Sequence, residues 1–379
     1  MSLLATLQQI PTTPAMVFEQ QAIVRNAEIL AELAHHSGCK PLYSIKALPL
    51  SAVLQWVKPY LEGFAVSSLF EARLADEVLQ GSGSIHLTSP GIRADEIAAL
   101  QGLCTHISFN SRPQWQRLQT QATAASCGLR INPQLSFAAD RRYDPCGPYS
   151  KLGVNLQELW LQGLDKGIQG LHVHTMFAAT DFAPLLTTVQ LLRQMLGSAL
   201  QQLQWLNLGG GYLFGAIQDH RPFIELVQRL RGEYGVEVYI EPGKAVVGNA
   251  GYLVASVIDL FSSDGKTIAV LDSSVNHLPE VFEYQRPPQL LGQVEQGQHR
   301  TVLVGSTCLA GDVFGEYSFA QPLALGSRVV FQQVGAYSLI KANRFNGYQL
   351  PALYALQEGH SLQLLKEDTY AAYREQWWL

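Results

Sequence analysis

Two hydrophobic patterns alternate through about the first 248 residues. Short apolar, partly β-branched runs typical of buried strands are separated by longer stretches with apolar residues at helical spacing. Eight strand-like runs follow one another, at residues 42–46, 63–67, 85–88, 106–110, 128–132, 170–174, 205–208 and 238–241. Eight strand–helix alternations predict an α/β fold of the (β/α)8 TIM-barrel type rather than an open doubly wound sheet.

The pattern of hydrophobic residues changes after residue 248. Closely spaced β-branched runs separated by Gly and Pro predict a mostly antiparallel β domain. These runs are 251–261, 267–271, 300–304 and 328–333. An early run at 15–18 precedes the first barrel helix and is expected to pair with this second domain. We therefore predict a barrel at 20–247 and a β-rich domain formed by 1–19 and 248–379.

Composition agrees with a two-domain globular protein. The 379 residues exceed the usual size of a single core, and 47% are hydrophobic and 15% charged. A net charge of −5 without a basic block argues against nucleic-acid binding. The five cysteines are scattered and never form C-x-x-C, which argues against a disulfide framework and against a metal site.

The sequence also shows neither a signal peptide nor a membrane-spanning segment. The first residues lack a charged segment, and their apolar stretch is interrupted by Gln9 and Pro11, so they do not resemble a signal peptide. No run approaches the length of a membrane span. We expect a cytoplasmic protein with no membrane partner.

Catalytic groups of a (β/α)8 barrel gather where strands end. Four predicted strand ends carry Lys46, Arg130, His174 and Glu241. A lysine there either covers apolar surface at the rim or, once desolvated, acts as an amine nucleophile able to form a Schiff base. Glu241 is either an ordinary rim glutamate or a partner for a protonated pyridine nitrogen.

Phosphate chemistry is indicated after strands seven and eight. Gly209, Gly210 and Gly211 follow the seventh strand, where barrels often bind phosphate through backbone N–H groups, although such a run usually marks only a turn. Lys244 follows the eighth strand and either meets the same phosphate or is a solvated surface lysine.

The second domain contains the motifs GSTCLAGD, with Cys308 and Asp312, and GAYSLIKANRFNG, with Tyr337. A cysteine flanked by Gly305 and Gly311 in a loop predicts an exposed thiol. The common alternative for a free cysteine is a buried, inert one.

These motifs, taken in order, resemble one known family. The combination of YSIKAL, NLGGGY, EPGKAVVGNAGYLVASV, LDSSVNHLPEVFE, GSTCLAGDVFGEYSF and IKANRFNG is similar to the fold-type III pyridoxal-phosphate decarboxylases. That superfamily includes ornithine, diaminopimelate and arginine decarboxylases, with alanine racemase more distant. The likeness is greatest to carboxynorspermidine decarboxylases and extends from Thr13 to Pro351.

The resemblance implies pyridoxal 5'-phosphate as cofactor and assigns residues to it. Lys46 would hold the cofactor covalently, and His174 would stack on its ring. Glu241 would bind the pyridine nitrogen, and Arg130 the side of the phenolic oxygen. The phosphate would be bound by Gly209, Gly210, Gly211 and Tyr337.

The resemblance also implies how the substrate is handled. Cys308 would protonate the carbon that loses carbon dioxide, and Asp312 would contact the substrate. The Cys308 loop would complete the active site of a partner subunit, which implies a homodimer. Asp272, Glu280 and Glu283 lie where the family reads the distal amine, and carboxylates suit a cationic tail.

The chain departs from the family pattern in two places. His174 begins HTMFA where the subfamily usually reads HTLCE, so that Phe177 and Ala178 replace a thiol and a carboxylate. Lys244 stands where relatives in the subfamily often have an acidic residue. Both departures leave the cofactor residues intact and bear on the choice of substrate.

Three hypotheses follow. The leading one is decarboxylation of carboxynorspermidine or carboxyspermidine to norspermidine or spermidine. A second is decarboxylation of another amino acid, such as an intermediate of siderophore assembly or a diamino acid. A non-enzymatic regulatory relative that binds the same cofactor is disfavoured, because such proteins are small and lack a β domain, and a racemase is disfavoured by Cys308.

Overall fold

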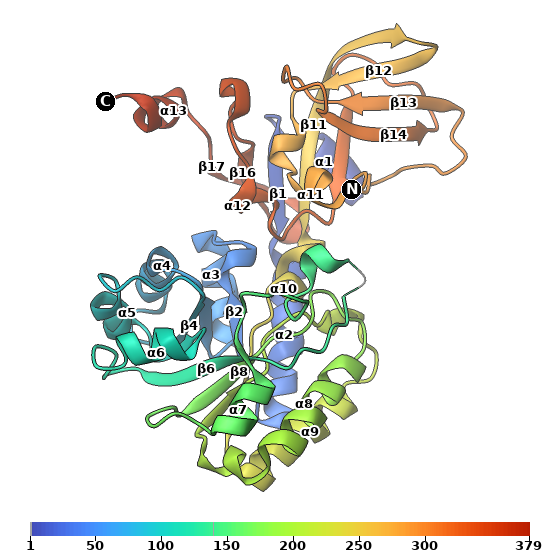
Figure 1. Cartoon of the computed structure of the whole chain (residues 1–379). Coiled ribbons are helices and arrows are strands. Elements are labelled where there is room, and N and C mark those ends of the chain that lie inside the picture. The colour runs from blue at the N-terminus through green and yellow to red at the C-terminus, as the bar shows by residue number, and fades with distance from the viewer. Residues whose placement is uncertain (1, 139) are drawn as a thin grey trace. The chain divides into compact units, whose positions relative to one another are not determined.

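The computed structural model describes residues 2–138 and 140–379 and divides into two compact units. One unit is formed by 24–246, and the other by 1–23 together with 247–379. Figure 1 shows both units, coloured along the chain. The second unit is called the β domain below.

Residues 24–246 form a closed ring of eight parallel strands. The ring order is β2-β3-β4-β5-β6-β8-β9-β10, and β10 pairs again with β2. The strands are β2 (Lys40–Ser44), β3 (Gly63–Val66), β4 (Ser84–Ser89), β5 (His106–Phe109), β6 (Ser126–Asn132), β8 (Gly170–Val173), β9 (Trp205–Asn207) and β10 (Glu237–Ile240). A two-residue strand, β7 (Val154–Asn155), pairs with the end of β6. The predicted barrel is confirmed.

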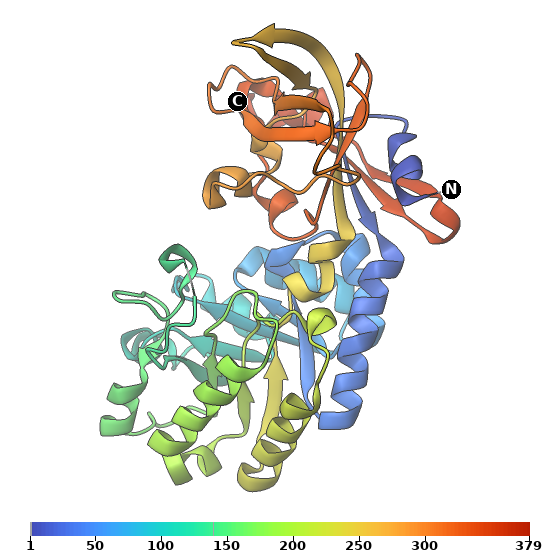
Figure 2. The ribbon, with the colours of Figure 1, turned by 90° about the vertical axis from the view of Figure 1, so that its right-hand side faces the viewer.

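Helices cover the outside of the ring (Figures 1 and 2). They are α2 (Gln20–Ser37), α3 (Ser51–Val57), α4 (Leu69–Leu79), α5 (Ile97–Leu103), α6 (Arg112–Leu118), α7 (Leu156–Gln162), α8 (Ala183–Leu196) and α9 (Arg221–Tyr234). The sequence predicts a helix over 182–203, but α8 ends at Leu196 because Gly197 adopts a φ of 51°. The chain continues as a 3-10 helix at Gly197–Gln202.

The barrel interior is tightly packed where the strands begin. Most strand residues are buried, as expected for a parallel sheet covered on each side, and polar side chains lie among them on the inner face. Trp205 is buried and its indole N–H donates to the Ser126 hydroxyl at 2.8 Å. Gly170 makes room for this ring, because a Cβ there would lie 2.0 Å from Trp205 Cδ2.

The β domain is built on one mixed sheet. Its order is β14-β13-β12-β11-β1-β16-β17, and β15 also pairs with β11. The strands are β1 (Ala15–Glu19), β11 (Gly251–Ser263), β12 (Lys266–Leu271), β13 (His299–Val304), β14 (Val313–Phe319), β15 (Arg328–Gln332), β16 (Ala352–Leu356) and β17 (Leu362–Lys366). Most pairs are antiparallel, whereas β1–β16 and β12–β13 are parallel. A mostly antiparallel β domain that includes the early strand is therefore confirmed.

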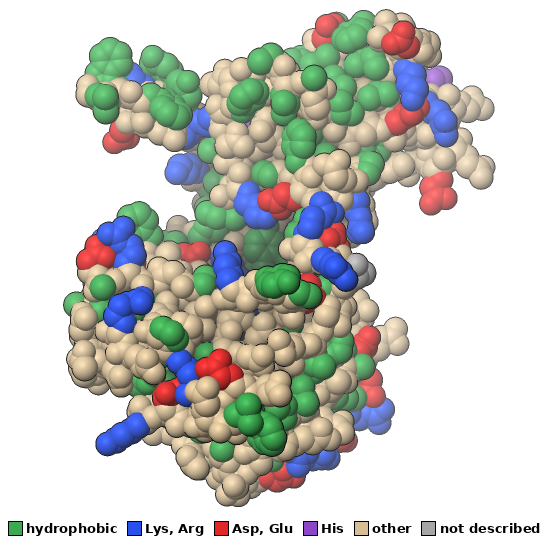
Figure 3. Space-filling model, viewed as in Figure 1, with side chains coloured by type: hydrophobic (Ala, Val, Ile, Leu, Met, Phe, Trp, Pro, Cys, Tyr) green, Lys and Arg blue, Asp and Glu red, His purple; other side chains and the backbone are tan. Residues whose placement is uncertain are grey.

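Several elements of the β domain carry no sequence signal that we detected. The helix α13 (Tyr370–Trp377) has no buried residue, although Tyr370, Tyr373 and Trp377 lie along one face. It exposes Tyr370, Trp377 and Trp378, and Figure 3 shows apolar side chains gathered at this end of the chain. Also unpredicted are α1 (Leu3–Gln8), β14, β16 and β17. Within the described residues, we find no helix with the length and apolarity that a membrane crossing requires.

Candidate active site

The carboxyl ends of the barrel strands surround a small polar hollow. The structure brings together there four residues that the sequence places at strand ends: Lys46, Arg130, His174 and Glu241. Further lining residues are Ser44, Ala65, Val66, Ser67, Thr88 and His172. The hollow thus combines an amine, a guanidinium, a carboxylate and imidazoles at the end of the barrel where catalysis is expected.

Lys46 is presented by a short turn after β2. The strand ends at Ser44, and the 3-10 turn Ile45–Ala47 follows. A hydrogen bond stabilises the turn, because the hydroxyl of the buried Tyr43 donates to Leu48 O at 3.1 Å. Ile45 and Ala47 are buried whereas Lys46 is exposed, and no described carboxylate forms an ion pair with Lys46. Its amine is therefore available for chemistry.

Glu241 is a buried carboxylate held by two side chains. Asn207 Nδ2 donates to Glu241 Oε1 at 2.8 Å, and His172 Nε2 lies 3.4 Å from Glu241 Oε2. Burial alone would raise the pKa of Glu241, but the hydrogen bond from His172 and the charge of Lys46 outweigh it and hold the pKa well below its usual value. Glu241 is therefore ionised and suited to accept a proton-bearing ring nitrogen.

Both imidazoles of the hollow are neutral. Burial, followed by the charges of Arg130 and Lys46, lowers the pKa of His174 well below its usual value. Burial likewise lowers the pKa of His172. His174 Nδ1 accepts the N–H of Gly210 at 3.1 Å, which orients its ring beside the glycine loop. A flat, neutral ring in this position fits stacking on an aromatic cofactor.

Two N–H groups of the glycine loop already donate hydrogen bonds within the protein. Gly209 donates its N–H to Asn207 Oδ1 at 2.9 Å, and Gly210 donates to His174. Two of the three N–H groups that the sequence expects to face a phosphate thus already have protein acceptors. Gly211 N–H has no acceptor among the described residues. Of the three, the Gly211 N–H therefore remains open to a ligand.

Two stacked rings with a cation on each side adjoin the glycine loop. We call Arg142, Tyr143, Phe177 and Lys244 the rim stack. Lys244 Nζ lies 5.5 Å from the centroid of the Phe177 ring. The rings of Phe177 and Tyr143 stack with centroids 5.9 Å apart, and Arg142 Cζ lies 5.6 Å from the Tyr143 ring.

The rim stack joins the two departures from the family pattern, because Phe177 and Lys244 contact each other. The rim stack also lies against the glycine loop. A Cβ at Gly211 would come within 2.1 Å of Met176 O and 3.0 Å of Phe177 N. The two substitutions therefore act as one feature of the barrel mouth.

Asn207 and Thr88 are given no role by the sequence, although Thr88 closes a predicted strand. Asn207 bridges Glu241 and Gly209, and its alternation with the buried Trp205 along β9 could have placed it on the inner face. Thr88 lines the hollow, and its buried hydroxyl has no hydrogen-bond partner among the described residues. Such an orphan donor, beside an amine and a carboxylate, fits a polar aromatic cofactor.

Cys308 lies in a loop of the β domain, and its thiol is exposed, whereas the other four cysteines are buried. Asn346 Oδ1 accepts both the Cys308 N–H at 3.0 Å and the Cys308 thiol at 3.1 Å. The loop is held by the buried Asp312, whose carboxylate accepts from Val275 N at 2.8 Å and from Thr307 N at 3.1 Å. Asp312 therefore shapes the loop that presents Cys308.

The three carboxylates predicted to bind a distal amine lie in two separate places. Glu280 and Glu283 lie on α11 (Glu280–Tyr284), whereas Asp272 accepts a hydrogen bond from Thr13 and lines a pocket that includes neither glutamate. Glu283 pairs with Lys341 at 2.6 Å. Glu280 Oε1 accepts from the Ser338 hydroxyl at 2.5 Å.

One oxygen of Glu280 is unusual. Its Oε2 is buried and has no hydrogen-bond partner among the described residues, and burial raises the pKa of Glu280. Tyr337 precedes α12 (Ser338–Lys341) with a φ of 69°, and Lys341 Nζ lies 5.7 Å from its ring. Burial raises the pKa of Tyr337 to about 12, so its phenol is neutral and able to donate.

Known proteins resemble this chain over nearly its whole length. Residues 41–335 match the family described as "Pyridoxal-dependent decarboxylase, C-terminal sheet domain". A carboxynorspermidine/carboxyspermidine decarboxylase from Campylobacter jejuni is 35% identical, over 95% of this chain and 97% of that protein. A carboxyaminopropylagmatine decarboxylase from Synechocystis is 34% identical, over 97% and 96%. The crystal structure of carboxynorspermidine decarboxylase with norspermidine, from Campylobacter jejuni, has a TM-score of 0.88 at 32% identity and covers 97% of this chain and 100% of that one.

The fold and the hollow define a (β/α)8 barrel with a β domain, whose barrel strand ends bring together a lysine amine and an ionised glutamate. The matches then fix the family. The chain belongs to the pyridoxal-dependent decarboxylases, which are carbon–carbon lyases.

Proposed function

We propose that this enzyme decarboxylates an amino acid with a cationic, polyamine-like tail, carboxynorspermidine or carboxyspermidine first among them, and that it works in the cytoplasm. The single observation that carries the chemistry is the hollow in which Lys46, free of any described ion pair, accompanies the ionised Glu241. The relatives named for carboxynorspermidine and carboxyspermidine support the substrate.

Pyridoxal 5'-phosphate fits the residues present. When bound it supplies an electron sink for the electron pair that remains after carboxylate loss. Lys46 would hold it covalently, Glu241 its ring nitrogen and His174 its ring face, and Arg130 would face the phenolic oxygen. Gly211, with its loop neighbours Gly209 and Gly210, and Lys244 and Tyr337 would bind the phosphate.

Cys308 is the proposed proton donor. Its exposed thiol, steadied by Asn346, would deliver a proton to the substrate carbon that loses carbon dioxide. Asp312 would then act on the substrate through the loop that it shapes.

Glu280 is the proposed reader of the distal amine. An ammonium donating to its unpartnered Oε2 would supply the missing hydrogen bond and keep the carboxylate ionised. Glu283 would contribute less, since Lys341 already balances its charge. Asp272 remains a candidate, although its present neighbours differ.

The active unit is proposed to be a homodimer in which the Cys308 loop of one subunit completes the barrel site of the other. Mixing Lys46→Ala and Cys308→Ala subunits tests this, because one site of each mixed dimer then has both groups. Partial recovery of activity is expected. If the mixture stays as inactive as its two parents, each site is built from a single chain.

A second substrate is supported by the comparisons, because a relative named for carboxyaminopropylagmatine is as similar as the others. Mass spectrometry of products from carboxynorspermidine, carboxyspermidine, carboxyaminopropylagmatine and diaminopimelate would rank them by kcat/KM. The proposal fails if diaminopimelate is preferred or if none is decarboxylated.

A further inference from the structure

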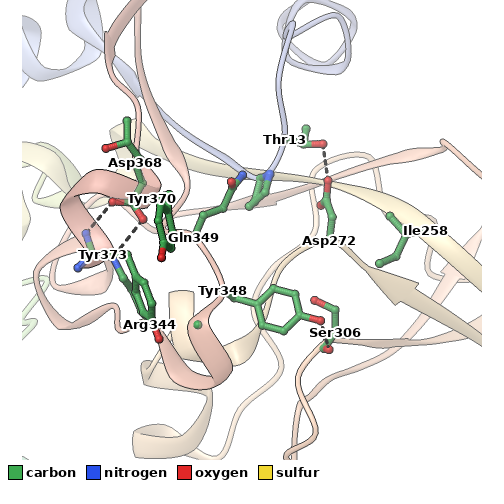
Figure 4. Close-up of a pocket in the computed structure, with 13 residues that line it drawn as sticks. Thr13, Ile258, Asp272, Ser306, Arg344, Tyr348, Gln349, Asp368, Tyr370 and Tyr373 are labelled. Atoms are coloured by element: carbon green, nitrogen blue, oxygen red, sulfur yellow. Dashed lines mark hydrogen bonds and ion pairs between the residues drawn. The ribbon is translucent and has the colours of Figure 1, made fainter. Parts of the chain in front are cut away.

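The β domain contains a pocket of its own, separate from the residues of the barrel hollow. Its volume is about 500 Å3, and every lining residue belongs to the β domain. Figure 4 shows Thr13 and Asp272 on one side and Arg344 with Asp368 on the other. A volume of roughly 300–1,000 Å3 is typical of sites for small molecules.

Asp272 supplies the carboxylate of this pocket that has no ion-pair partner: burial raises its pKa, while its hydrogen bonds and the more distant charge of Arg328 act in the opposite direction. Its Oδ2 accepts from the Thr13 hydroxyl at 2.5 Å, and its Oδ1 accepts from Ser256 N–H at 2.8 Å. No lysine or arginine among the described residues forms an ion pair with Asp272. Asp368, by contrast, is bound through both oxygens by Arg344, at 2.6 and 3.1 Å. The pocket lining therefore carries one net negative charge.

Aromatic side chains form much of the remaining wall. Tyr348, Tyr370 and Tyr373 all line the pocket. Tyr348 also donates its hydroxyl proton to Ser306 O at 2.6 Å, two residues before Cys308. Electron-rich rings and a carboxylate are the partners that an alkylammonium ion prefers. An anion would be repelled by Asp272, and a neutral apolar ligand would bury that carboxylate without a counter-charge.

We propose that this pocket is a second binding site, for an aliphatic amine whose ammonium pairs with Asp272 while its methylene chain lies among the tyrosine rings. Through the Tyr348–Ser306 hydrogen bond the bound amine would contact the segment that carries Cys308. Only the identity of that amine with the reaction product rests on the proposed function.

Calorimetric titration of the cofactor-loaded full chain with norspermidine tests the site. Asp272→Asn removes the charge yet keeps both hydrogen bonds, because the amide can donate to Thr13 and accept from Ser256. Norspermidine should bind this variant's pocket about 10–100-fold more weakly, the effect of losing a charge-assisted hydrogen bond. Tyr373→Leu should weaken it by about 3–10-fold, the effect of losing one cation–π contact.

Two controls bound the result. Asp259→Asn alters an exposed carboxylate on β11 outside the pocket and should bind norspermidine like the parent. Heptane-1,7-diol, a neutral chain of similar length, should not bind the pocket. Unfolding temperatures within the range of the parent show that each variant is folded.

The outcomes separate this proposal from the proposed function. If the substrate assignment is wrong, the barrel site ignores norspermidine, and the parent still shows one binding event that Asp272→Asn weakens. If the pocket proposal is wrong, parent, Asp272→Asn and Tyr373→Leu bind the same number of norspermidine molecules with equal affinity. The latter result would also follow if a second copy of the chain covered the pocket, and it overturns the proposal.

Discussion

The two ends of the barrel carry the same residue types on the same strands, but in different states. Strand β2 has Lys40 at its start and Lys46 just beyond its end, and β10 has Glu237 at its start and Glu241 beyond its end. At the start of the strands Lys40 and Glu237 form an ion pair of 2.6 Å. At the other end Lys46 has no described ion pair, and Glu241 is held by uncharged groups.

The histidines repeat this contrast. His86 and His106 stack with ring centroids 3.9 Å apart, and the Tyr239 ring lies 4.4 Å from that of His86. We call Lys40, His86, His106, Glu237 and Tyr239 the basal cluster. Lys40 and Tyr239 both donate to Glu237, whereas the amine of Lys46 in the hollow has no described ion pair. Each end also has a buried polar atom without a partner among the described residues, His86 Nε2 in the basal cluster and Thr88 Oγ1 in the hollow. Residue type alone therefore does not locate a site; strand direction does.

Replacing Lys46 and Lys40 by alanine, one at a time, should give the largest difference in activity between the two ends of the barrel. Lys46→Ala should lose activity on the order of 10³-fold or more, because the covalent attachment point of the cofactor is removed. Lys40→Ala should cost at most about 1 kcal/mol of stability, as expected for a partly exposed ion pair. Borohydride reduction followed by peptide mapping should place the cofactor on Lys46 in the parent and in Lys40→Ala. If the cofactor were instead fixed to Lys40, the active site would lie where the strands begin.

The two glutamates provide the next test. Glu241→Gln should slow turnover by about 10²–10³-fold, the range found when a preorganised electrostatic partner of the reaction is removed. Glu237→Gln should leave turnover within about twofold, since it removes only a half-exposed ion pair far along the strand. The measurement is kcat with saturating cofactor. Equal losses in both variants would mean that the ends do not differ in function.

The sequence predicted the barrel and its strand ends well, because strand period and strand order decide which residues meet there. Lys46, Arg130, His174 and Glu241 come together for that reason. The sequence could not show that the N–H groups of Gly209 and Gly210 already have acceptors in Asn207 and His174. Nor could it show that Asp272 lies apart from Glu280, because hydrogen-bond partners such as Thr13 lie far away in sequence. The helix α13 was missed since it buries no residue.

The basal cluster should make stability depend on pH. Burial lowers the pKa of His106 to about 4, below its unfolded value of 6.5, and burial also lowers the pKa of His86. The unfolded chain therefore takes up protons first, so stability is full above about pH 6.5 and falls as the pH drops toward 4. His106 alone should contribute a loss of about 2 kcal/mol between pH 7.5 and 5.

Urea unfolding at both pH values measures this loss. His106→Gln should reduce the difference between the two pH values, whereas His35→Gln, at an exposed position on α2, should not. An unchanged pH dependence in His106→Gln would show that the basal cluster does not exclude protons.

The smallest expected effect compares two lysine–ring contacts of equal length. Lys40 lies 5.5 Å from the Tyr239 ring in the basal cluster, and Lys244 lies 5.5 Å from the Phe177 ring in the rim stack. If Phe177 positions Lys244 for the cofactor phosphate, Phe177→Leu should raise the cofactor dissociation constant by about 2–5-fold, and Phe177→Tyr should restore it. The dissociation constant is measured by titrating the apo-protein and so does not depend on turnover. In a Lys244→Met background Phe177→Leu should have no added effect, because the cation that the ring positions is gone; additive effects would make Phe177 a packing residue only. Lys40→Met should leave the cofactor dissociation constant at the parental value, because the basal contact stabilises the fold and touches no phosphate.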